Sequence, residues 1–312
     1  MKERLFLSVI AAIAISMLFS CTLEEEVFTA NPSPTIPSDK KEVKFSSNIS
    51  RLEPTSTIPS RISGNRWVPG DAIGTFMLGK DNFAVVDGKR NVKYVTKSSG
   101  NSGNFFAENN AIYFPEDGRK VRFMSYYPYN KSISGTIYNV DVFKQIPQSD
   151  IDLLYCFDTS SAYNKDIETQ KVPMAFKHQL AKVYINVKDG DGLQGYHLMN
   201  MKVTLSGLNT KADFNLLSGE FDNYSAITPI SPSVLIAGGG NVYSSEAIVI
   251  PTRKISDAVI IFKLNNEKGE VYTYKIDNTF EKGKKYTYNV VINSTWIDVS
   301  MTTHNWFNLY MD

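Results

Sequence analysis

Short runs in which apolar and polar residues alternate recur along most of the chain, and they constrain its fold more than any other feature. Turn-forming residues separate these runs roughly every 8–15 positions. Clear examples are VRFMSYY at 121–127, AKVYINV at 181–187 and KKYTYNVVI at 284–292. No amphipathic helix longer than about two turns stands out between them. Because a period of two places one face of a strand in a core, the pattern predicts an all-β fold of sandwich type.

A polar, irregular stretch, SSAYNKDIETQK at 160–171, interrupts the series of strands, and a new series of regular strands begins after it. The chain beyond its first 20 residues has about 290 residues, a length that favours two domains. We therefore expect an N-terminal β-sandwich domain over residues 42–172 and a C-terminal β-sandwich domain over residues 173–312.

The first 20 residues have the pattern of a secretory signal peptide. Lys2 and Arg4 are basic, and the apolar run that follows is too short to span a bilayer. The run ends in LFSC at 18–21, which resembles the lipobox of bacterial lipoproteins. In that class the cysteine, here Cys21, is lipidated and becomes the first mature residue. The alternative is a buried N-terminal helix that ends in a cysteine by chance.

An acidic run and a proline-containing segment follow the lipobox. Glu24, Glu25 and Glu26 resemble the surface-export signal of Bacteroidetes lipoproteins, which places these proteins on the outer face of the outer membrane. The alternative for this run is an ordinary solvated linker. Residues 21–41 contain three prolines among polar residues, so we predict a flexible tether that lifts the folded body off the membrane.

Charge and cysteine content exclude several classes of function. Without residues 1–20 the chain carries 31 basic and 31 acidic residues, and a nucleic-acid binder usually has a basic surplus. We therefore expect no nucleic-acid partner, and membrane contact through the lipid alone. With Cys21 lipidated, Cys156 would be the one remaining cysteine, so no disulfide framework can form. We expect Cys156 to fill a core position.

No pattern of catalytic or metal-binding residues is present. The three histidines, His178, His197 and His304, are scattered and lack the spacing of metal ligands. No nucleophile elbow, zinc-protease motif or phosphate-binding loop occurs. We expect neither an enzyme nor a bound cofactor or metal. His178 stands between apolar residues, which is typical of a hydrogen-bonded core or junction histidine.

Four landmarks, in order along the chain, resemble motifs of the fimbrillin family of Bacteroidetes surface lipoproteins. They are WVPGDAIG at 67–74, VRFMSYYPYN at 121–130, FKHQLAKV at 176–183 and FEKGKKYTY at 280–288. The resemblance implies two transthyretin-like β-sandwich domains. It also implies a place at the cell surface, anchored by lipid in the outer membrane or built into a fimbrium. There the chain would join other fimbrial subunits as shaft, tip, anchor or accessory subunit.

The resemblance further implies trimming by an arginine-directed protease in the region of the first strand. Trimming removes that strand, and a strand from a neighbouring subunit fills the groove, since an open sheet exposes unpaired backbone and core. Arg61 matches the arginine that precedes the WxxGD element in the family, and Arg51 and Arg66 are close to it. Cleavage between Arg51 and Arg66 would release the strand predicted over 42–50. The alternative is that these arginines are ordinary exposed loop residues.

Two questions stay open at the level of sequence. A surface glycan-binding lipoprotein would share the anchor, the tether and the tandem β-sandwiches. In that protein exposed rings such as Tyr126, Tyr129 and Trp306 could stack on sugars, although their alternation fits packing equally well. The C-terminal segment at 295–312 fits the last strand of the second domain, a donor strand for a neighbour, or both.

Overall fold

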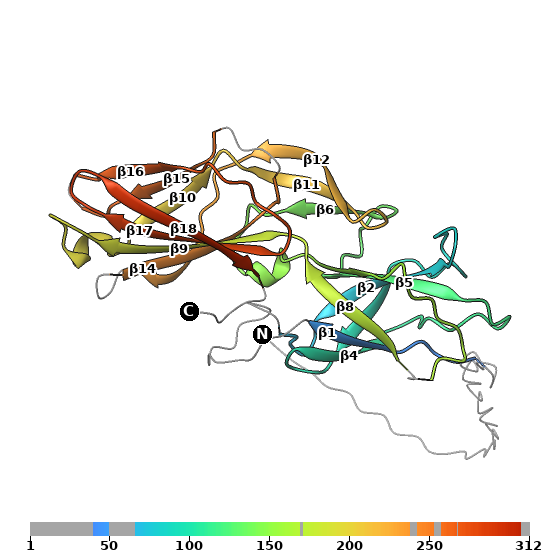
Figure 1. The fold of residues 1–312 in the computed structure, drawn as a ribbon. Helices are drawn as coiled ribbons and strands as arrows, with labels where there is room; N and C mark the ends of the chain where they lie inside the picture. Colours follow the sequence, from blue (N-terminus) through green and yellow to red (C-terminus); the bar gives the residue numbers. More distant parts are fainter. Residues whose placement is uncertain are drawn as a thin grey trace, which may run out of the picture. The chain divides into compact units, whose positions relative to one another are not determined.

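The computed structural model describes residues 40–49, 66–168, 171–237, 242–252, 257–266 and 268–306. Within these ranges the regular structure is β-strand apart from two short 3-10 turns, η1 (Gln148–Asp150) and η2 (Gly195–Leu198). The all-β class expected from the alternating runs is confirmed (Figure 1). None of the described helices is long and apolar enough to cross a membrane.

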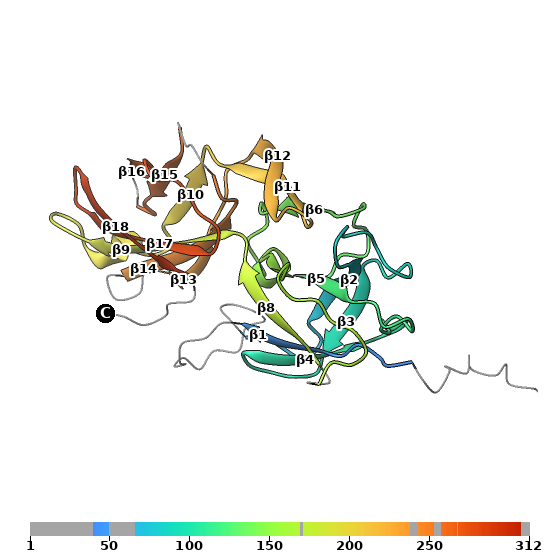
Figure 2. The same ribbon diagram turned by 45° about the vertical axis from the view of Figure 1, so that its right-hand side comes forward.

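Seven strands between residues 45 and 178 pair in a closed order, so that the last strand returns to the first (Figure 2). In pairing order they are β1 (Phe45–Ile49), β4 (Ser102–Ala107), β3 (Val92–Thr96), β2 (Ala72–Gly79), β5 (Val121–Tyr127), β7 (Leu154–Phe157) and β8 (Val172–His178). All neighbours are antiparallel except β8 and β1, which run parallel and close the barrel.

Strands β2 and β5 are buried on both faces, so each belongs to two cores. Met77 and Phe123 lie in the barrel core, whereas Phe76 and Met124 belong to a larger core shared with the second half of the chain. The run at 121–127 alternates in sequence, but all seven residues of β5 are buried. The reason is that its second face is covered by other strands instead of water.

The strands from residue 181 onwards, together with β6 (Ile137–Asp141), form a sandwich of one five-stranded sheet and two three-stranded sheets. The five-stranded sheet has the order β13 (Ser233–Ala237), β14 (Val242–Val249), β9 (Ala181–Asp189), β17 (Lys284–Ile292) and β18 (Ile297–Asn305). The smaller sheets are β10 (Lys202–Ser206), β15 (Val259–Lys263) and β16 (Val271–Lys275), and β12 (Glu220–Ile227), β11 (Asn209–Asn215) and β6 (Ile137–Asp141).

The sheets of the sandwich meet through one continuous apolar core. Ile185 of β9 and Tyr288 of β17 lie in the same buried cluster as Leu205 of β10 and Phe262 of β15. The ring of Tyr288 meets that of Tyr274 edge to face, with centroids 5.9 Å apart. Each buried side chain of this size contributes about 1.5–3 kcal/mol. The outward residues of β9 and β17 are mostly polar, as the alternation at 181–187 and 284–292 predicts.

Two strands pair with partners in a way that the domain boundary predicted between residues 172 and 173 does not allow for. Strand β8 begins at Val172 and pairs with β1 and β7 inside the barrel, so the second set of sheets begins only at Ala181. Strand β6 precedes that division, yet it pairs with β11 from the second half of the chain. Local alternation predicts that a strand exists, but the partner of a strand is decided by contacts far away in sequence.

Candidate functional site

Most residues predicted to take part in lipidation, export and cleavage lie outside the described ranges. These are Cys21, Glu24, Glu25, Glu26, Arg51 and Arg61, together with the predicted signal peptide and nearly all of the tether. Arg66 is described and is exposed directly before the buried Trp67. The lipidation, export and cleavage expected at these residues stay predictions.

The strand that the cleavage hypothesis would release is a full member of the barrel. Strand β1 pairs antiparallel with β4, where Phe45 lies opposite Phe105, and parallel with β8, where Phe45 lies beside Val172. Ahead of it the Val43 amide donates to the Ile112 carbonyl at 2.8 Å. The strand predicted over 42–50 is therefore present, and its backbone is hydrogen-bonded on both sides. Its loss would leave the facing edges of β4 and β8 without partners.

The side chains of this strand fill the centre of the barrel. Val43 and Phe45 are both fully buried. The Phe45 ring meets Tyr94 and Phe123 edge to face, with centroids 4.8 and 5.1 Å away. Each such aromatic pair contributes about 0.5–1.5 kcal/mol beyond the burial of its surface. Removal of β1 would thus open an apolar cavity as well as two strand edges.

Tyr94 of β3 links Val43, just before β1, to the connection between β4 and β5. Its hydroxyl donates to the Val43 carbonyl at 3.4 Å and accepts from the Ile112 amide at 3.0 Å. Burial raises the pKa of this phenol well above its ordinary value. The hydroxyl therefore stays protonated and serves as a structural donor and acceptor.

The WxxGD element forms a turn with a large anchor in the barrel. Trp67 is buried, and its ring meets Phe105, Tyr127 and Phe176 edge to face at 5.0, 5.5 and 5.4 Å. Asp71 closes the turn by accepting the Val68 amide at 2.7 Å. The motif thus forms a Gly-Asp turn with an apolar anchor. The anchor contacts two of the strands that flank β1, which places it beneath the groove that β1 fills.

Charged residues at the start of the described chain add only weak surface contacts. Lys40 pairs with Glu116 at 3.0 Å, and Lys41 Nζ donates to the carbonyls of Lys165 and Ile167 at 2.9 and 3.1 Å. Exposed ion pairs of this kind contribute about 0–1 kcal/mol each. The attachment of this segment therefore depends on β1 itself, through its backbone ladders and Phe45.

The C-terminal strand is folded against its own body as far as the structure describes it. Strand β18 pairs with β17 from Asn305 to Ile297, and the Trp306 amide donates to the Gly283 carbonyl at 2.7 Å. The Trp306 ring stacks on His178 with centroids 4.1 Å apart. Residues 307–312 lie outside the described ranges. Up to Trp306, this segment thus forms the last strand of the sandwich.

His178 has the structural role expected from its apolar neighbours. It is buried, and its Nδ1 lies 2.8 Å from Asp152 Oδ1 in the connection before β7. Stacking on Trp306 links the last residue of β8 to the residue that follows β18. Among the described residues no group of three or more His, Cys, Asp or Glu side chains could hold a metal ion.

The aromatic residues named for the glycan-binding alternative do not form a platform for sugars. Tyr126 and Trp306 are buried, so the expectation that their rings are exposed is wrong. The Tyr126 hydroxyl donates to Asn91 Oδ1 at 2.7 Å instead. Tyr129 is partly exposed, and the Lys93 ammonium lies 5.8 Å from its ring centroid. The alternation of these rings reflects packing.

Cys156 fills a core position, as expected. Burial raises the pKa of its thiol to about 12. Because only the thiolate reacts with alkylating reagents, we expect negligible modification by iodoacetamide of the native chain at pH 8. Complete modification should follow in 6 M guanidinium chloride, where the thiol regains its ordinary pKa of about 8.5. Peptide mass spectrometry measures both, and rapid modification of Cys156 in the native chain would contradict its burial.

Comparison with known proteins agrees with the landmarks and the fold. The chain matches the fimbrillin-like family over residues 60–306. It is 32% identical over 265 residues to a candidate fimbrium subunit, Fim1C, of Bacteroides uniformis, covering 82% of this chain and 84% of that protein.

Two solved structures have the same fold, and both are of candidate cell adhesion proteins. The one from Bacteroides uniformis has a TM-score of 0.70 and 28% identity, covering 87% of this chain and 100% of that one. The one from Bacteroides ovatus has a TM-score of 0.66 and 20% identity, covering 88% and 99%. With its ordered landmarks, its barrel and its sandwich, the chain belongs to the fimbrillin-like family.

Proposed function

We propose that this chain is a structural or adhesive subunit of fimbriae, and that it assembles by exchange of its first strand. The family and the fimbrial role of the related Fim1C support the first part. One observation carries the second part: β1 completes the barrel between β4 and β8 and buries Phe45, while residues 50–65 connect it to the rest of the barrel. This connection contains Arg51 and Arg61, and Arg66 follows it.

Release of β1 would create a specific acceptor for another strand. The edges of β4 and β8 would expose unpaired amide and carbonyl groups, each of which is costly to bury without a partner. The space left by Val43 and Phe45 would accept apolar side chains at alternate positions of an incoming strand. A donor strand with an apolar residue at every second position satisfies both requirements, which is the physical basis of β-augmentation.

Delivery to the cell surface would depend on the N-terminal segment. In this proposal Cys21 is lipidated, Glu24 to Glu26 direct export, and the segment to residue 41 acts as a tether. Cleavage in the region from Arg51 to Arg66 then separates the lipid and β1 from the subunit that polymerises. The function is structural, and the proposal assigns no catalytic reaction to the chain.

Replacement of all three arginines tests this proposal. The variant with Arg51→Ala, Arg61→Ala and Arg66→Ala, produced in the native organism, should retain its lipidated N-terminus and form at least tenfold fewer fibres, because β1 stays in its groove. Electron microscopy counts the fibres, and mass spectrometry identifies the first residue of each assembled chain. Wild-type chains in fibres should begin after one of the three arginines.

The matched control is Arg90→Ala, which removes an exposed arginine elsewhere in the barrel. It should leave fibre number and the N-terminus unchanged. Assembled fibres whose chains still begin at lipidated Cys21 would contradict exchange of β1, although the chain would remain a fimbrillin-like protein.

A further inference from the structure

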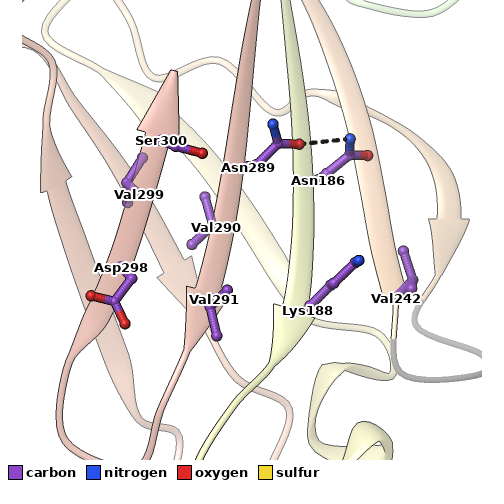
Figure 3. A pocket seen from close by; sticks show the side chains of 9 residues that line it. All are labelled: Asn186, Lys188, Val242, Asn289, Val290, Val291, Asp298, Val299 and Ser300. Atoms are coloured by element: carbon purple, nitrogen blue, oxygen red, sulfur yellow. Dashed lines mark hydrogen bonds between the residues drawn. The ribbon is translucent and has the colours of Figure 1, made fainter. Parts of the chain in front are cut away.

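A shallow groove of about 570 Å³ lies on the outer face of the five-stranded sheet (Figure 3). Strand register brings its residues together in two rows. Asn186, Asn289 and Ser300 lie side by side on β9, β17 and β18. The second row runs from Val242 through Lys188 and Val291 to Asp298. Nothing in the strand exchange proposed above uses this face.

The first row carries both hydrogen-bond donors and hydrogen-bond acceptors. Asn186 Nδ2 donates to Asn289 Oδ1 at 3.1 Å. This contact leaves the amide nitrogen of Asn289 and the amide oxygen of Asn186 without hydrogen-bond partners within the described ranges. The free donor and the free acceptor lie at opposite ends of this pair (Figure 3), and each can bond a hydroxyl group, which both donates and accepts.

The second row ends in a carboxylate that is held in one orientation. Asp298 Oδ2 accepts from Trp296 Nε1 at 3.0 Å and from Asn293 Nδ2 at 3.1 Å. Its Oδ1 accepts no bond from the described part of the chain and stays available to a ligand. The positive charge of Lys188 balances that of Asp298, so the groove has no excess charge that would select an anion or a cation.

Trp296 provides an exposed ring at the rim of the groove. It is 48% exposed, whereas the other two tryptophans, Trp67 and Trp306, are 1% and 4% exposed. Its hydrogen bond to Asp298 keeps the indole beside the second row. A large exposed ring next to polar groups suits a ligand that has one apolar face and hydrogen-bonding edges.

The turn that carries Trp296 is fixed by the neighbouring turn after β9. Asn293 is buried, and its Oδ1 accepts the Asp191 amide at 2.7 Å. The Ser294 amide donates to the Asp191 carbonyl at 2.9 Å. Gly190 permits this close approach, because a Cβ at that position would collide with Asn293. The rim is therefore formed before any ligand binds, which lowers the ordering cost of binding.

We propose that this groove binds a neutral carbohydrate chain. A pyranose ring has C–H faces that stack on the Trp296 indole, and its hydroxyl groups match Asn186, Asn289 and Asp298. A nucleic acid would require an excess of basic residues, and the groove contains a single lysine. A polypeptide that pairs through its backbone would need the free edge of the sheet at β18, and a strand added there would extend the sheet in its own plane and leave the groove on its face uncovered.

Binding of the full-length chain to immobilised oligosaccharides tests the proposal. The probes are neutral gluco-, manno- and galacto-oligosaccharides, with sialylated and sulfated oligosaccharides on the same array. We expect binding to at least one neutral series in preference to the charged ones. With the best neutral oligosaccharide in solution, we also expect a change in tryptophan fluorescence, because the ligand covers Trp296.

Three variants locate the site. Trp296→Ala should weaken binding about tenfold, because the ligand loses the exposed ring on which it stacks. Ser300→Trp should block the groove without removing any contact of the fold. This variant keeps the proposal testable if Trp296→Ala unfolds the turn that carries Trp296. The control, Phe106→Ala, removes an aromatic side chain of the barrel that is 51% exposed and should leave affinity unchanged.

Three results would overturn the proposal. They are absence of binding to every neutral oligosaccharide at millimolar concentration, unchanged affinity in both Trp296→Ala and Ser300→Trp, and a stronger response to the charged oligosaccharides. If the two variants reduce fibre assembly while the wild-type chain binds no oligosaccharide, the face is a contact between subunits and the carbohydrate site is refuted. Fibre assembly itself can succeed or fail independently, because β1 lies outside the groove.

Discussion

Replacement of Phe45 by alanine is expected to lower the free energy of unfolding by about 3–5 kcal/mol, the usual cost of truncating a buried phenylalanine. Phe45 is fully buried, and it meets two other rings edge to face at the centre of the barrel. The cavity would lie between strands that are hydrogen-bonded on both sides of β1, so the backbone can relax little to fill it. Urea unfolding at constant m-value measures the change.

The control for Phe45→Ala is Phe106→Ala on the neighbouring strand β4. Phe106 is 51% exposed, and we expect its replacement to change stability by less than about 0.5 kcal/mol. If β1 is exchanged as proposed, wild-type and Phe45→Ala subunits should be equally stable once they are inside fibres, because Phe45 has left with the released segment. A loss below about 1 kcal/mol for Phe45→Ala in the uncleaved chain would contradict the packing of β1 in the barrel.

Replacement of Trp67 by alanine should have an effect of similar size, about 3–5 kcal/mol. The Trp67 ring meets Phe105, Tyr127 and Phe176, which belong to three different strands of the barrel. Its loss would therefore weaken contacts between β4, β5 and β8 at once. Thermal or urea unfolding of the full-length chain measures the loss.

Two further tryptophan variants serve as comparisons for Trp67→Ala. Trp67→Phe removes part of the buried volume, and Trp296→Ala removes an exposed ring. The Trp67 indole N–H is buried and donates to no acceptor among the described residues, so Trp67→Phe should lose volume but no hydrogen bond. We expect it to cost clearly less than Trp67→Ala. Trp296→Ala removes an exposed ring and should leave stability within about 1 kcal/mol of the wild type. Equal losses for Trp67→Ala and Trp296→Ala would contradict the anchoring role of Trp67.

The anchor and the first strand could be predicted because their signals are local. Trp67 stands beside a Gly-Asp turn, and the alternation around Phe45 marks a strand with one apolar face. His178 and Cys156 were likewise predictable as core residues, since apolar residues stand two positions to either side of His178 and directly on both sides of Cys156. In each case the side chain packs as its immediate neighbours suggest.

The rings at Tyr126 and Trp306 show where local pattern is insufficient. Alternation places a ring on one face of a strand, but it does not tell whether that face meets water or another layer. Tyr126 is covered because β5 lies between two cores, and Trp306 is covered because it stacks on His178 from the barrel. Two of the three rings named for glycan binding are therefore buried, whereas the exposed Trp296 has no distinguishing local signal.

The sequence by itself determined the all-β class, the positions of most strands, the turn anchored by Trp67 and the resemblance to the fimbrillin family. All of these depend on alternation, turn residues and ordered motifs, which are properties of neighbouring residues. Only the tertiary structure decided that β1 closes the barrel between β4 and β8, that β6 joins the second half of the chain, and that Asn186 lies beside Asn289. The physical reason is that strand partners and register are selected by burial and backbone pairing between segments far apart in sequence.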